Sequence, residues 1–244
     1  MSALEPTPLQ ATVGAALVGG GLIAGVARGV FHPHASLFGP TVWRGPAARS
    51  AVALTFDDGP DAHYTARIAE VLNAHQARAT FFCIGQELEP CRDLAKSLIS
   101  SGHELENHTY SHNTGRDLFS APRLVKDLQR CQDLLGDLTG RAPSYYRPAV
   151  GIRNPPVHAA ASALGLTVVT WTHSARDGVF ALTPRRARSL AARADAGSIL
   201  ALHDGQRLRN PSLREQTVRQ LPLLLQLLKE RGFALQTLTE LLQT

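Results

Sequence analysis

Residues 51–60 read Ala-Val-Ala-Leu-Thr-Phe-Asp-Asp-Gly-Pro, an apolar run that ends in two adjacent carboxylates and a turn dipeptide. A short apolar run bounded by a Gly-Pro turn predicts a buried strand. Successive side chains of a strand point to opposite faces, but where the strand bends into a loop Asp57 and Asp58 can converge on one site. Taken alone, the pattern also fits a turn in which both carboxylates are solvated.

Outward from this stretch, short apolar runs alternate with helix-length amphipathic segments. The intervals are too long for hairpins, so the alternation predicts an α/β fold with a parallel sheet. Seven strands without a nucleotide-binding glycine pattern favour a closed or nearly closed barrel, although periodicity alone does not exclude an open doubly wound sheet. The expected strands are Ala51–Phe56, Ala79–Ile84, Glu104–Asn107, Tyr145–Arg147, Thr167–Thr170, Ser198–His203 and Ala234–Gln236, and the expected helices are Tyr64–His75, Leu88–Ser101, Pro122–Leu138, Pro155–Leu164, Pro184–Ala194 and Ser212–Arg231.

Two histidines follow the third expected strand. His108 and His112 are separated by three residues, a spacing that places both imidazoles on one face if the segment turns helical. Together with a carboxylate from another strand end they make the three-ligand set of a hydrolytic zinc site, which keeps positions open for water and substrate. A histidine pair by itself is more often a surface or capping feature. The acidic end of the first strand is the observation that favours a metal site.

Two further polar residues end buried strands. Arg147 closes the fourth expected strand, where its guanidinium is placed to hold a carboxylate ionised. His203 is the first polar side chain at the carboxyl end of the run 198–203. Taken singly, one is an ordinary surface arginine and the other a satisfied strand-end histidine. Reactive residues of parallel α/β folds gather at the carboxyl ends of strands, so polar residues at four such ends predict one shared site.

Composition and charge indicate an ordinary globular domain and argue against a nucleic-acid partner. The chain has 244 residues, enough for one large core, and a formal net charge of +5. No Lys/Arg stripe is interleaved with aromatic residues, so we expect a solvated basic surface and no nucleic-acid partner. Cys83, Cys91 and Cys131 cannot all pair with one another and lack zinc-ligand spacing, so they do not decide the redox compartment.

The first 40 residues differ from the rest. We expect residues 1–40 to form an N-terminal arm, a membrane anchor or a signal segment, and residues 41–244 to form one folded domain. Residues 11–27 carry no charge, which is at the short limit for a membrane span, so membrane association is expected, with a soluble arm as the alternative. Glu5 stands where a signal peptide needs a basic segment, and Arg28 follows the stretch. These charges are inconsistent with simple export.

Five motifs follow one another between residues 50 and 240. They are TFDDGP at 55–60, ATFFCIG at 79–85, GHELENHTYSH at 102–112, RPAVGIRN at 147–154 and GSILALHD at 197–204. Their order resembles the polysaccharide deacetylase family, also known as the NodB homology domain or carbohydrate esterase family 4. The resemblance implies a distorted (β/α)7 barrel with parallel strands and metal-dependent hydrolysis of the N-acetyl groups of amino sugars.

The resemblance also implies a role for each matching catalytic residue. Asp57 corresponds to the catalytic base, and Arg147 would orient and ionise it. His203 corresponds to the general acid that protonates the departing amine. The backbone N–H near Val150 would contribute to the oxyanion hole, and Leu202 is implied as a substrate contact.

For the metal, the resemblance implies Asp58, His108 and His112 as the ligands of one divalent ion. We expect zinc, while cobalt and nickel also suit this ligand set.

One family segment departs from its usual pattern. Where the family carries an aspartate and, four residues later, a tryptophan, this chain has Ser174 and Gly178. The carboxylate that normally accompanies the acid histidine is therefore missing at its usual position. Asp177 is the nearest candidate to accompany His203, and the loss of the tryptophan removes a wall of the acetyl pocket.

We therefore expect a metal-dependent deacetylase acting on an N-acetylated glycan or glycoconjugate, as a monomer at the cell envelope or membrane. A deacylase of another sugar-linked or small amide is the alternative among enzymes. A carbohydrate-binding protein that has lost catalysis is the alternative from another class, although the low aromatic content is unusual for a dedicated sugar-binding surface.

Overall fold

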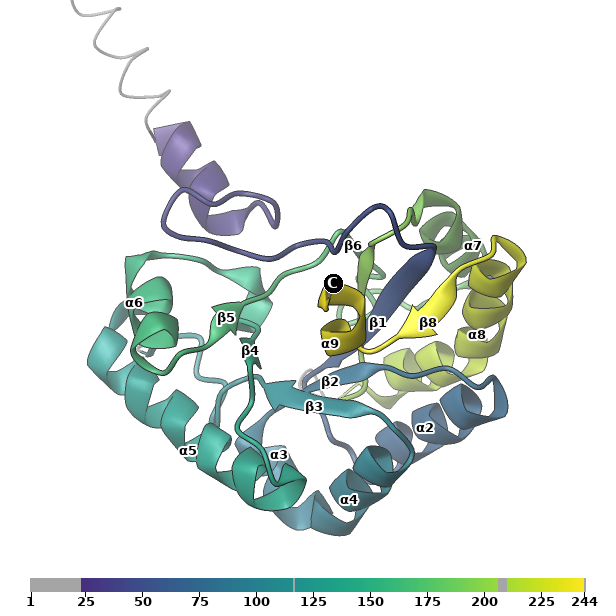
Figure 1. Cartoon of the computed structure of the whole chain (residues 1–244), viewed down its shortest axis with the longest axis horizontal. Helices are drawn as coiled ribbons and strands as arrows, with labels where there is room; N and C mark the ends of the chain where they lie inside the picture. Colours follow the sequence, from purple (N-terminus) through teal and green to yellow (C-terminus); the bar gives the residue numbers. More distant parts are fainter. Residues whose placement is uncertain (1–22, 116, 206–209, 244) are drawn as a thin grey trace, which may run out of the picture.

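In the computed structural model, a strongly curved sheet of parallel strands carries helices along its outer face (Figure 1). The structure describes residues 23–115, 117–205 and 210–243. The strands of the sheet are β1 (Ala51–Asp57), β2 (Thr80–Cys83), β3 (Glu104–Asn107), β4 (Tyr145–Tyr146), β5 (Thr167–Val168), β6 (His173–Ser174), β7 (Ile199–His203) and β8 (Ala234–Gln236).

The sheet is organised around β1. Seven strands follow the order β5-β4-β3-β2-β1-β7-β6, and β8 pairs with the first half of β1. All pairings between these strands are parallel. In the register, Asp57 lies opposite His203 of β7 on one side and Phe82 of β2 on the other. The pairing alone therefore brings the first carboxylate and the strand-end histidine to the same edge.

The helices that cover the sheet start at favourable residues. Proline occupies the first turn of four of them, where its missing N–H has no helical partner to lose. Asn154 and Thr183 cap two of these helices by accepting a hydrogen bond from the backbone. The helices are α2 (Tyr64–Ala74), α3 (Gly85–Leu88), α4 (Arg92–Ser100), α5 (Ala121–Thr139), α6 (Pro155–Ala163), α7 (Pro184–Arg193), α8 (Pro211–Glu230) and α9 (Leu238–Leu242).

The side chains of β1 divide between two sides of the sheet. Val52, Leu54 and Phe56 belong to the main hydrophobic core, which also contains residues of α2 and α8. Ala51 and Ala53 instead pack in a second cluster that contains leucines of α9. The alternation of a strand therefore directs Thr55 and Asp57 to the concave side, where the polar site is built.

The expected parallel α/β fold is confirmed, and each of the seven expected strands matches a strand of the structure. The sheet is a half-barrel, because β5 and β6 end the strand order without pairing with each other. Three of the labelled elements were not expected from the sequence, β6, α3 and α9. Strand β6 has two half-buried polar residues, α3 has four residues and α9 has five. Segments so short carry no readable periodicity.

The chain before β1 spans the open side of the half-barrel. Val42 forms a parallel bridge with Val169, just after β5, and Arg44 forms an antiparallel bridge with Ser198, just before β7. The Thr172 hydroxyl donates to the carbonyl of Trp43 at 2.7 Å. We call residues 42–44 the strap, since they link the two sides of the gap by backbone hydrogen bonds.

Residues 30–35 are held to the barrel by one buried arginine. The Arg153 side chain is almost fully buried, and its guanidinium donates to the carbonyls of Ala35 at 2.6 Å, of Val30 at 3.3 Å and of His32. The Arg153 backbone N–H also donates to the Val30 carbonyl. The segment before residue 40 therefore satisfies a charge inside the domain that we expected to begin at residue 41.

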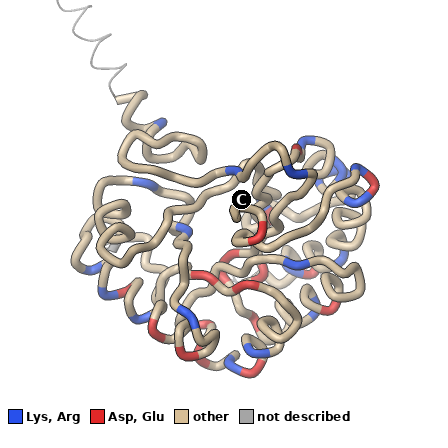
Figure 2. Tube along the Cα trace, in the orientation of Figure 1, with Lys and Arg blue, Asp and Glu red and all other residues tan. Residues whose placement is uncertain are grey.

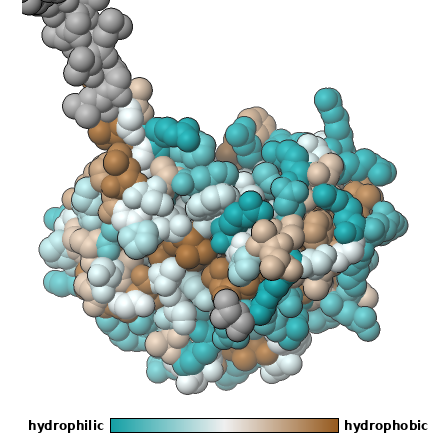
Figure 3. All heavy atoms as spheres, turned by 45° about the horizontal axis from the view of Figure 1, so that its top comes forward, coloured by the Kyte–Doolittle hydropathy of each residue, from teal (hydrophilic) through white to brown (hydrophobic). Residues whose placement is uncertain are grey.

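The expected membrane segment, residues 11–27, lies largely outside the described residues. Its last part belongs to a helix over residues 23–31, which projects from the barrel with apolar side chains on its surface (Figure 3). Ile23 and Phe31 are strongly exposed there. Across the part of the chain that the structure describes, no helix has the length and apolar character needed to cross a bilayer.

We expect a chain that starts at residue 41 to unfold more easily than one that starts at residue 23. The shorter chain leaves the buried Arg153 guanidinium without its carbonyl partners, which should lower the free energy of unfolding by about 3 kcal/mol. Urea unfolding of both chains measures this difference. Arg153→Met should destabilise the longer chain and partly restore the shorter one. An equal effect of Arg153→Met in both chains contradicts the explanation.

Candidate active site

The carboxyl ends of β1, β3, β4 and β7 meet around a small cavity of about 70 Å³. Every residue that the sequence placed in the metal or acid–base chemistry lines this cavity, except Arg147 and Asp177, which lie behind it. The lining residues are Asp57, Asp58, His108, His112, Pro148, Val150, Gly151, Trp171, Ser174, Ala201 and His203.

Three of these residues have the geometry of a metal site. Asp58 Oδ1 lies 3.5 Å from His108 Nε2 and 3.3 Å from His112 Nε2, and one ligand atom from each residue lies within 4.8 Å of the others. Asp58 adopts a left-handed backbone conformation with φ of 74°, which turns its carboxylate away from the direction of the strand. An Asp-His-His set with this spacing is consistent with one divalent metal ion.

The hydrogen bonds behind the histidines orient them for such a role. His108 Nδ1 lies 2.7 Å from the carbonyl oxygen of Arg147, so Nδ1 carries the proton and the lone pair of Nε2 faces Asp58. The segment that follows is held by Asp127 of α5, whose carboxylate accepts from the backbone N–H groups of Tyr110 and Ser111. The loop between the two histidines is therefore fixed from outside the site.

The electrostatics of Asp58 agree with this arrangement. Burial disfavours the ionised carboxylate, but when the neighbouring rings are protonated, a hydrogen bond from His108 and the charges of His108, His203 and His112 hold the pKa of Asp58 well below its ordinary value. The carboxylate is therefore ionised at neutral pH, as an anionic metal ligand must be.

Asp57 is bound to a fully buried arginine. Arg147 Nη1 donates to Asp57 Oδ1 and to the Thr55 hydroxyl, both at 2.7 Å, and Nη2 donates to the Thr170 carbonyl at 2.9 Å. The guanidinium also lies 4.1 Å from the centre of the Phe82 ring. These contacts fix the orientation of one carboxylate oxygen and balance its charge, while Asp57 still lines the cavity.

His203 is paired with Asp177. His203 Nδ1 lies 2.8 Å from Asp177 Oδ1, and the carboxylate also accepts from the Thr217 hydroxyl at 2.8 Å and from Arg214 at 3.1 Å. Burial disfavours the imidazolium, but the adjacent Asp177 carboxylate raises the pKa of His203 to about 9. Burial likewise disfavours the carboxylate, but His203 and then Arg214 lower the pKa of Asp177 to about 2. The pair is therefore charged on both sides at neutral pH.

The residues that depart from the family pattern have distinct surroundings. The Ser174 hydroxyl accepts from the backbone N–H of Arg176, and the residue lines the cavity without contacting His203 by any hydrogen bond found among the described residues. At Gly178, an added Cβ would lie 3.0 Å from His203 Nε2. The glycine therefore leaves the ring edge of His203 open on the side where the family carries a tryptophan.

The two positions expected to contact substrate differ. Val150 lines the cavity with an exposed side chain and a left-handed backbone, φ 49°. The Leu202 side chain instead lies in the main hydrophobic core, fully buried. The alternation of β7 explains this, because Ala201 and His203 face the cavity and the residue between them faces the helices.

Several supporting residues were not found from the sequence. Arg214 and Thr217 lie in the first two turns of α8, where their spacing is that of any amphipathic helix, and only the tertiary fold brings them to Asp177. Trp171 lines the cavity, and its ring covers Gly151 so closely that an added Cβ there would lie 2.6 Å from it. Its position just after an expected strand was the one available signal.

Asp204, the last residue of the motif at 197–204, also has a supporting position. It is fully buried and accepts a hydrogen bond from the Thr65 hydroxyl at 2.6 Å. Its backbone N–H donates to the Asp57 carbonyl. Burial raises the pKa of Asp204 to about 7, against the effect of Thr65. The residue anchors the turn that follows Asp58 and does not line the cavity.

Comparison with known proteins decides the family. A family model described as polysaccharide deacetylase matches residues 44–169. The chain belongs to the polysaccharide deacetylase family. The matched range includes Asp57, Asp58, His108, His112 and Arg147 and ends before Asp177 and His203.

Two relatives match most of the chain. A peptidoglycan-N-acetylglucosamine deacetylase of Bacillus cereus is 31% identical over 207 residues, which are 84% of this chain and 94% of the relative. A chitooligosaccharide deacetylase of Bradyrhizobium is 31% identical over 206 residues, 78% of this chain and 90% of the relative. This polysaccharide deacetylase is thus similar to enzymes named for different glycans.

Solved structures agree with the fold. A peptidoglycan N-acetylglucosamine deacetylase in complex with an N-hydroxybenzamide superposes with a TM-score of 0.74 at 28% identity, covering 84% of this chain and 93% of that one. A family 4 acetyl xylan esterase from Clostridium thermocellum, solved with a cobalt ion, gives 0.69 at 30% identity, covering 78% and 89%.

We expect Asp177→Asn to lower the pKa of His203 from about 9 to its ordinary value of about 6.5 or below. The substitution removes the negative partner and leaves Arg214 beside the ring, and both changes favour the neutral imidazole. NMR titration of the histidine ring protons in metal-stripped protein measures the pKa directly. Ser174→Ala is the matched control and should leave it unchanged. A shift in the serine variant alone contradicts the assignment of Asp177.

Proposed function

We propose that this polysaccharide deacetylase removes N-acetyl groups from the amino sugars of a polysaccharide or glycoconjugate. The observation that carries the proposal is that three possible metal ligands and two further groups line one cavity. The ligands are Asp58, His108 and His112. The further groups are Asp57 and His203, each held by its own buried partner. One group is placed to accept a proton and the other to donate one. The names of the relatives support an N-acetylated glycan as the substrate class.

The residues of the chain divide the reaction between them. The chemistry that a divalent ion supplies when bound is polarisation of the acetyl carbonyl and acidification of a water, from a pKa of about 15.7 towards about 7. Asp57 is proposed to take the proton of the attacking water. Arg147 keeps its carboxylate oriented, so that no reorganisation of the base is needed during the reaction.

His203 is proposed as the general acid. Its Nδ1 is bound to Asp177, so the proton on Nε2 is the one available to the cavity. The amide nitrogen leaves poorly as an anion and needs this proton. The raised pKa, about 9, keeps the imidazolium populated at neutral pH. The backbone N–H of Val150 is proposed to donate to the developing oxyanion, a kind of contact worth about 10²–10³ in rate.

Cofactor, assembly and location are proposals as well. Zinc is the preferred ion for two imidazoles and one carboxylate, with cobalt or nickel as substitutes. A monomer is proposed as the active unit because one chain supplies every residue of the cavity. We propose that the chain works at the cell envelope in association with a membrane, supported by the exposed apolar side chains Ile23, Val26 and Phe31.

The decisive experiment is acetate release from a panel of substrates, with metal analysis of the same sample. The panel contains chito-oligosaccharides, peptidoglycan fragments, an N-acetylated exopolysaccharide and acetylated xylan, so that amide and ester hydrolysis are compared. We expect release from N-acetylated glycans that requires metal. A metal-loaded sample that binds these glycans and releases no acetate contradicts the proposal and favours a binding protein.

We expect substitutions of the two adjacent aspartates to have different effects on metal content and on acetate release. Asp58→Asn removes the anionic oxygen from a three-ligand set and should sharply weaken metal retention. Asp57→Asn should retain the metal and lower turnover by about 10²–10⁴, the usual contribution of a positioned proton transfer. Metal content and acetate release are measured on both variants after identical loading. Loss of metal from Asp57→Asn with retention in Asp58→Asn reverses the assignment.

A further inference from the structure

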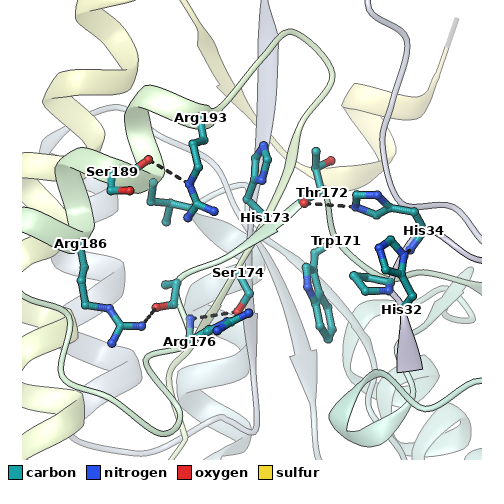
Figure 4. Close-up of a pocket in the computed structure, with 13 residues that line it drawn as sticks. His32, His34, Trp171, Thr172, His173, Ser174, Arg176, Arg186, Ser189 and Arg193 are labelled. Carbon is teal, nitrogen blue, oxygen red and sulfur yellow. Dashed lines mark hydrogen bonds between the residues drawn. The ribbon is translucent and has the colours of Figure 1, made fainter. Parts of the chain in front are cut away.

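A second and larger cavity adjoins the catalytic one. Its volume is about 630 Å³, and Trp171 and Ser174 line both cavities. Figure 4 shows α7 on one side of this second cavity and the Trp171 ring with His32 and His34 on the other. A group bound here therefore lies directly beside the catalytic cavity.

The charge in this cavity is positive. Arg176, Arg186 and Arg193 line it, and its lining contains no carboxylate. Among the described residues none of these three guanidinium groups takes part in an ion pair. Arg186 donates to the Ala175 carbonyl at 2.7 Å and Arg193 donates to the Ser189 carbonyl at 3.2 Å. A guanidinium has five N–H donors, so each of these two has capacity for a further acceptor.

Two histidines of the cavity, His32 and His173, add polar groups rather than charge. Burial lowers the pKa of His32 and of His173, and the nearby arginines lower it further. Both rings are therefore neutral at pH 7, when the arginines carry the full charge. The charge of the Asp195 carboxylate has a smaller, opposite effect on the pKa of His173, but Asp195 is exposed and does not line the cavity.

The basic surface continues outward along α7. A shallower hollow of about 550 Å³ shares Arg176 and Arg186 with the second cavity and adds Arg185 and the exposed ring of Phe180. The Arg186 guanidinium lies 5.2 Å from the centre of that ring. Figure 2 marks Lys and Arg positions around α7 in the upper right of the view. We call the second cavity and this hollow together the α7 groove.

We propose that the α7 groove binds an anionic group, a carboxylate or a phosphate, carried by the same glycan whose acetyl group enters the catalytic cavity. The proposal rests on the proposed deacetylase function and makes the substrate an acidic glycan. Arginine presents paired donors that match the oxygens of a carboxylate or a phosphate. Guanidinium groups that converge on a hollow without compensating carboxylates attract such anions, and Phe180 offers an apolar face to a neighbouring sugar ring.

The first test measures binding without catalysis. Glucuronate and glucose 1-phosphate, with neutral glucose as the control, are titrated into the metal-stripped full chain at low salt and followed by NMR. We expect at least one anionic sugar to bind and glucose not to bind. Arg186→Gln and Arg193→Gln should each weaken binding about tenfold, since a hydrogen bond to a charged group contributes about that factor.

Arg188→Gln is the matched control. Arg188 is an exposed arginine of the same helix and lines neither part of the α7 groove, so its loss should leave binding unchanged. If all three variants weaken binding equally, or none does, the proposal is overturned. Among the described residues, the Arg193 side chain donates a hydrogen bond only to the Ser189 carbonyl of its own helix, so its variant is expected to fold, and thermal melting verifies this. Binding of an oligonucleotide is measured on the same proteins. If the chain binds the oligonucleotide more tightly than either anionic sugar, and the Arg186 and Arg193 variants lose that binding, the proposal is also overturned.

The second test compares substrates by kcat/KM. A neutral chito-oligosaccharide is compared with an oligomer of alternating glucuronate and N-acetylglucosamine and with a chito-oligosaccharide that carries a terminal phosphate. We expect one anionic substrate to be preferred about tenfold, with the preference lost in Arg193→Gln, and the preferred substrate identifies the anion. A preference for the neutral oligomer overturns the proposal. If anions bind in an arginine-dependent way but no substrate releases acetate, the α7 groove remains an anion-binding site and the proposed deacetylase function is wrong.

Discussion

The buried contact between Arg147 and Asp57 is the interaction on which the site depends. It joins the ends of β1 and β4, and the carbonyl of the same arginine binds His108. One residue therefore positions both the proposed base and a proposed metal ligand. Breaking such a buried pair by removing one partner typically costs about 3–5 kcal/mol, because a charge is left without compensation. Asp57 and His108 are therefore both held by Arg147, so that a displacement of this arginine affects both of them.

The central part of this arrangement could be predicted because its residues lie close together in the sequence. The run at 51–60 is buried, patterned and bounded by a turn, so strand, strand end and carboxylates could be placed from one stretch. The spacing of His108 and His112 was equally readable. The partner of His203 was harder to identify, since the family position carries Ser174, and Asp177 was expected only from its proximity in the chain. Its contact with the ring depends on the three-dimensional path of the loop.

What could not be predicted arises from contacts between distant segments. Arg214 and Thr217 occupy ordinary positions of an amphipathic helix, and nothing in their spacing points to Asp177. The same limit applies to the basic residues. The net charge of +5 indicated a solvated surface, and five arginines between residues 176 and 193 gave no stripe with aromatic residues. Folding of this segment against β6 gathers three of them around one cavity.

The strap at residues 42–44 has a consequence for how the chain folds. Its contacts join segments far apart in sequence: Arg44 and Ala196, whose carbonyl it binds, are separated by 152 positions. Contacts of high sequence separation carry a large loop-closure entropy and slow the folding of parallel sheets. During synthesis the strap leaves the ribosome early, yet its binding site is complete only when the residues that precede β7 have emerged. We therefore expect the half-barrel to close late in folding, with the backbone edges at its opening unpaired until then.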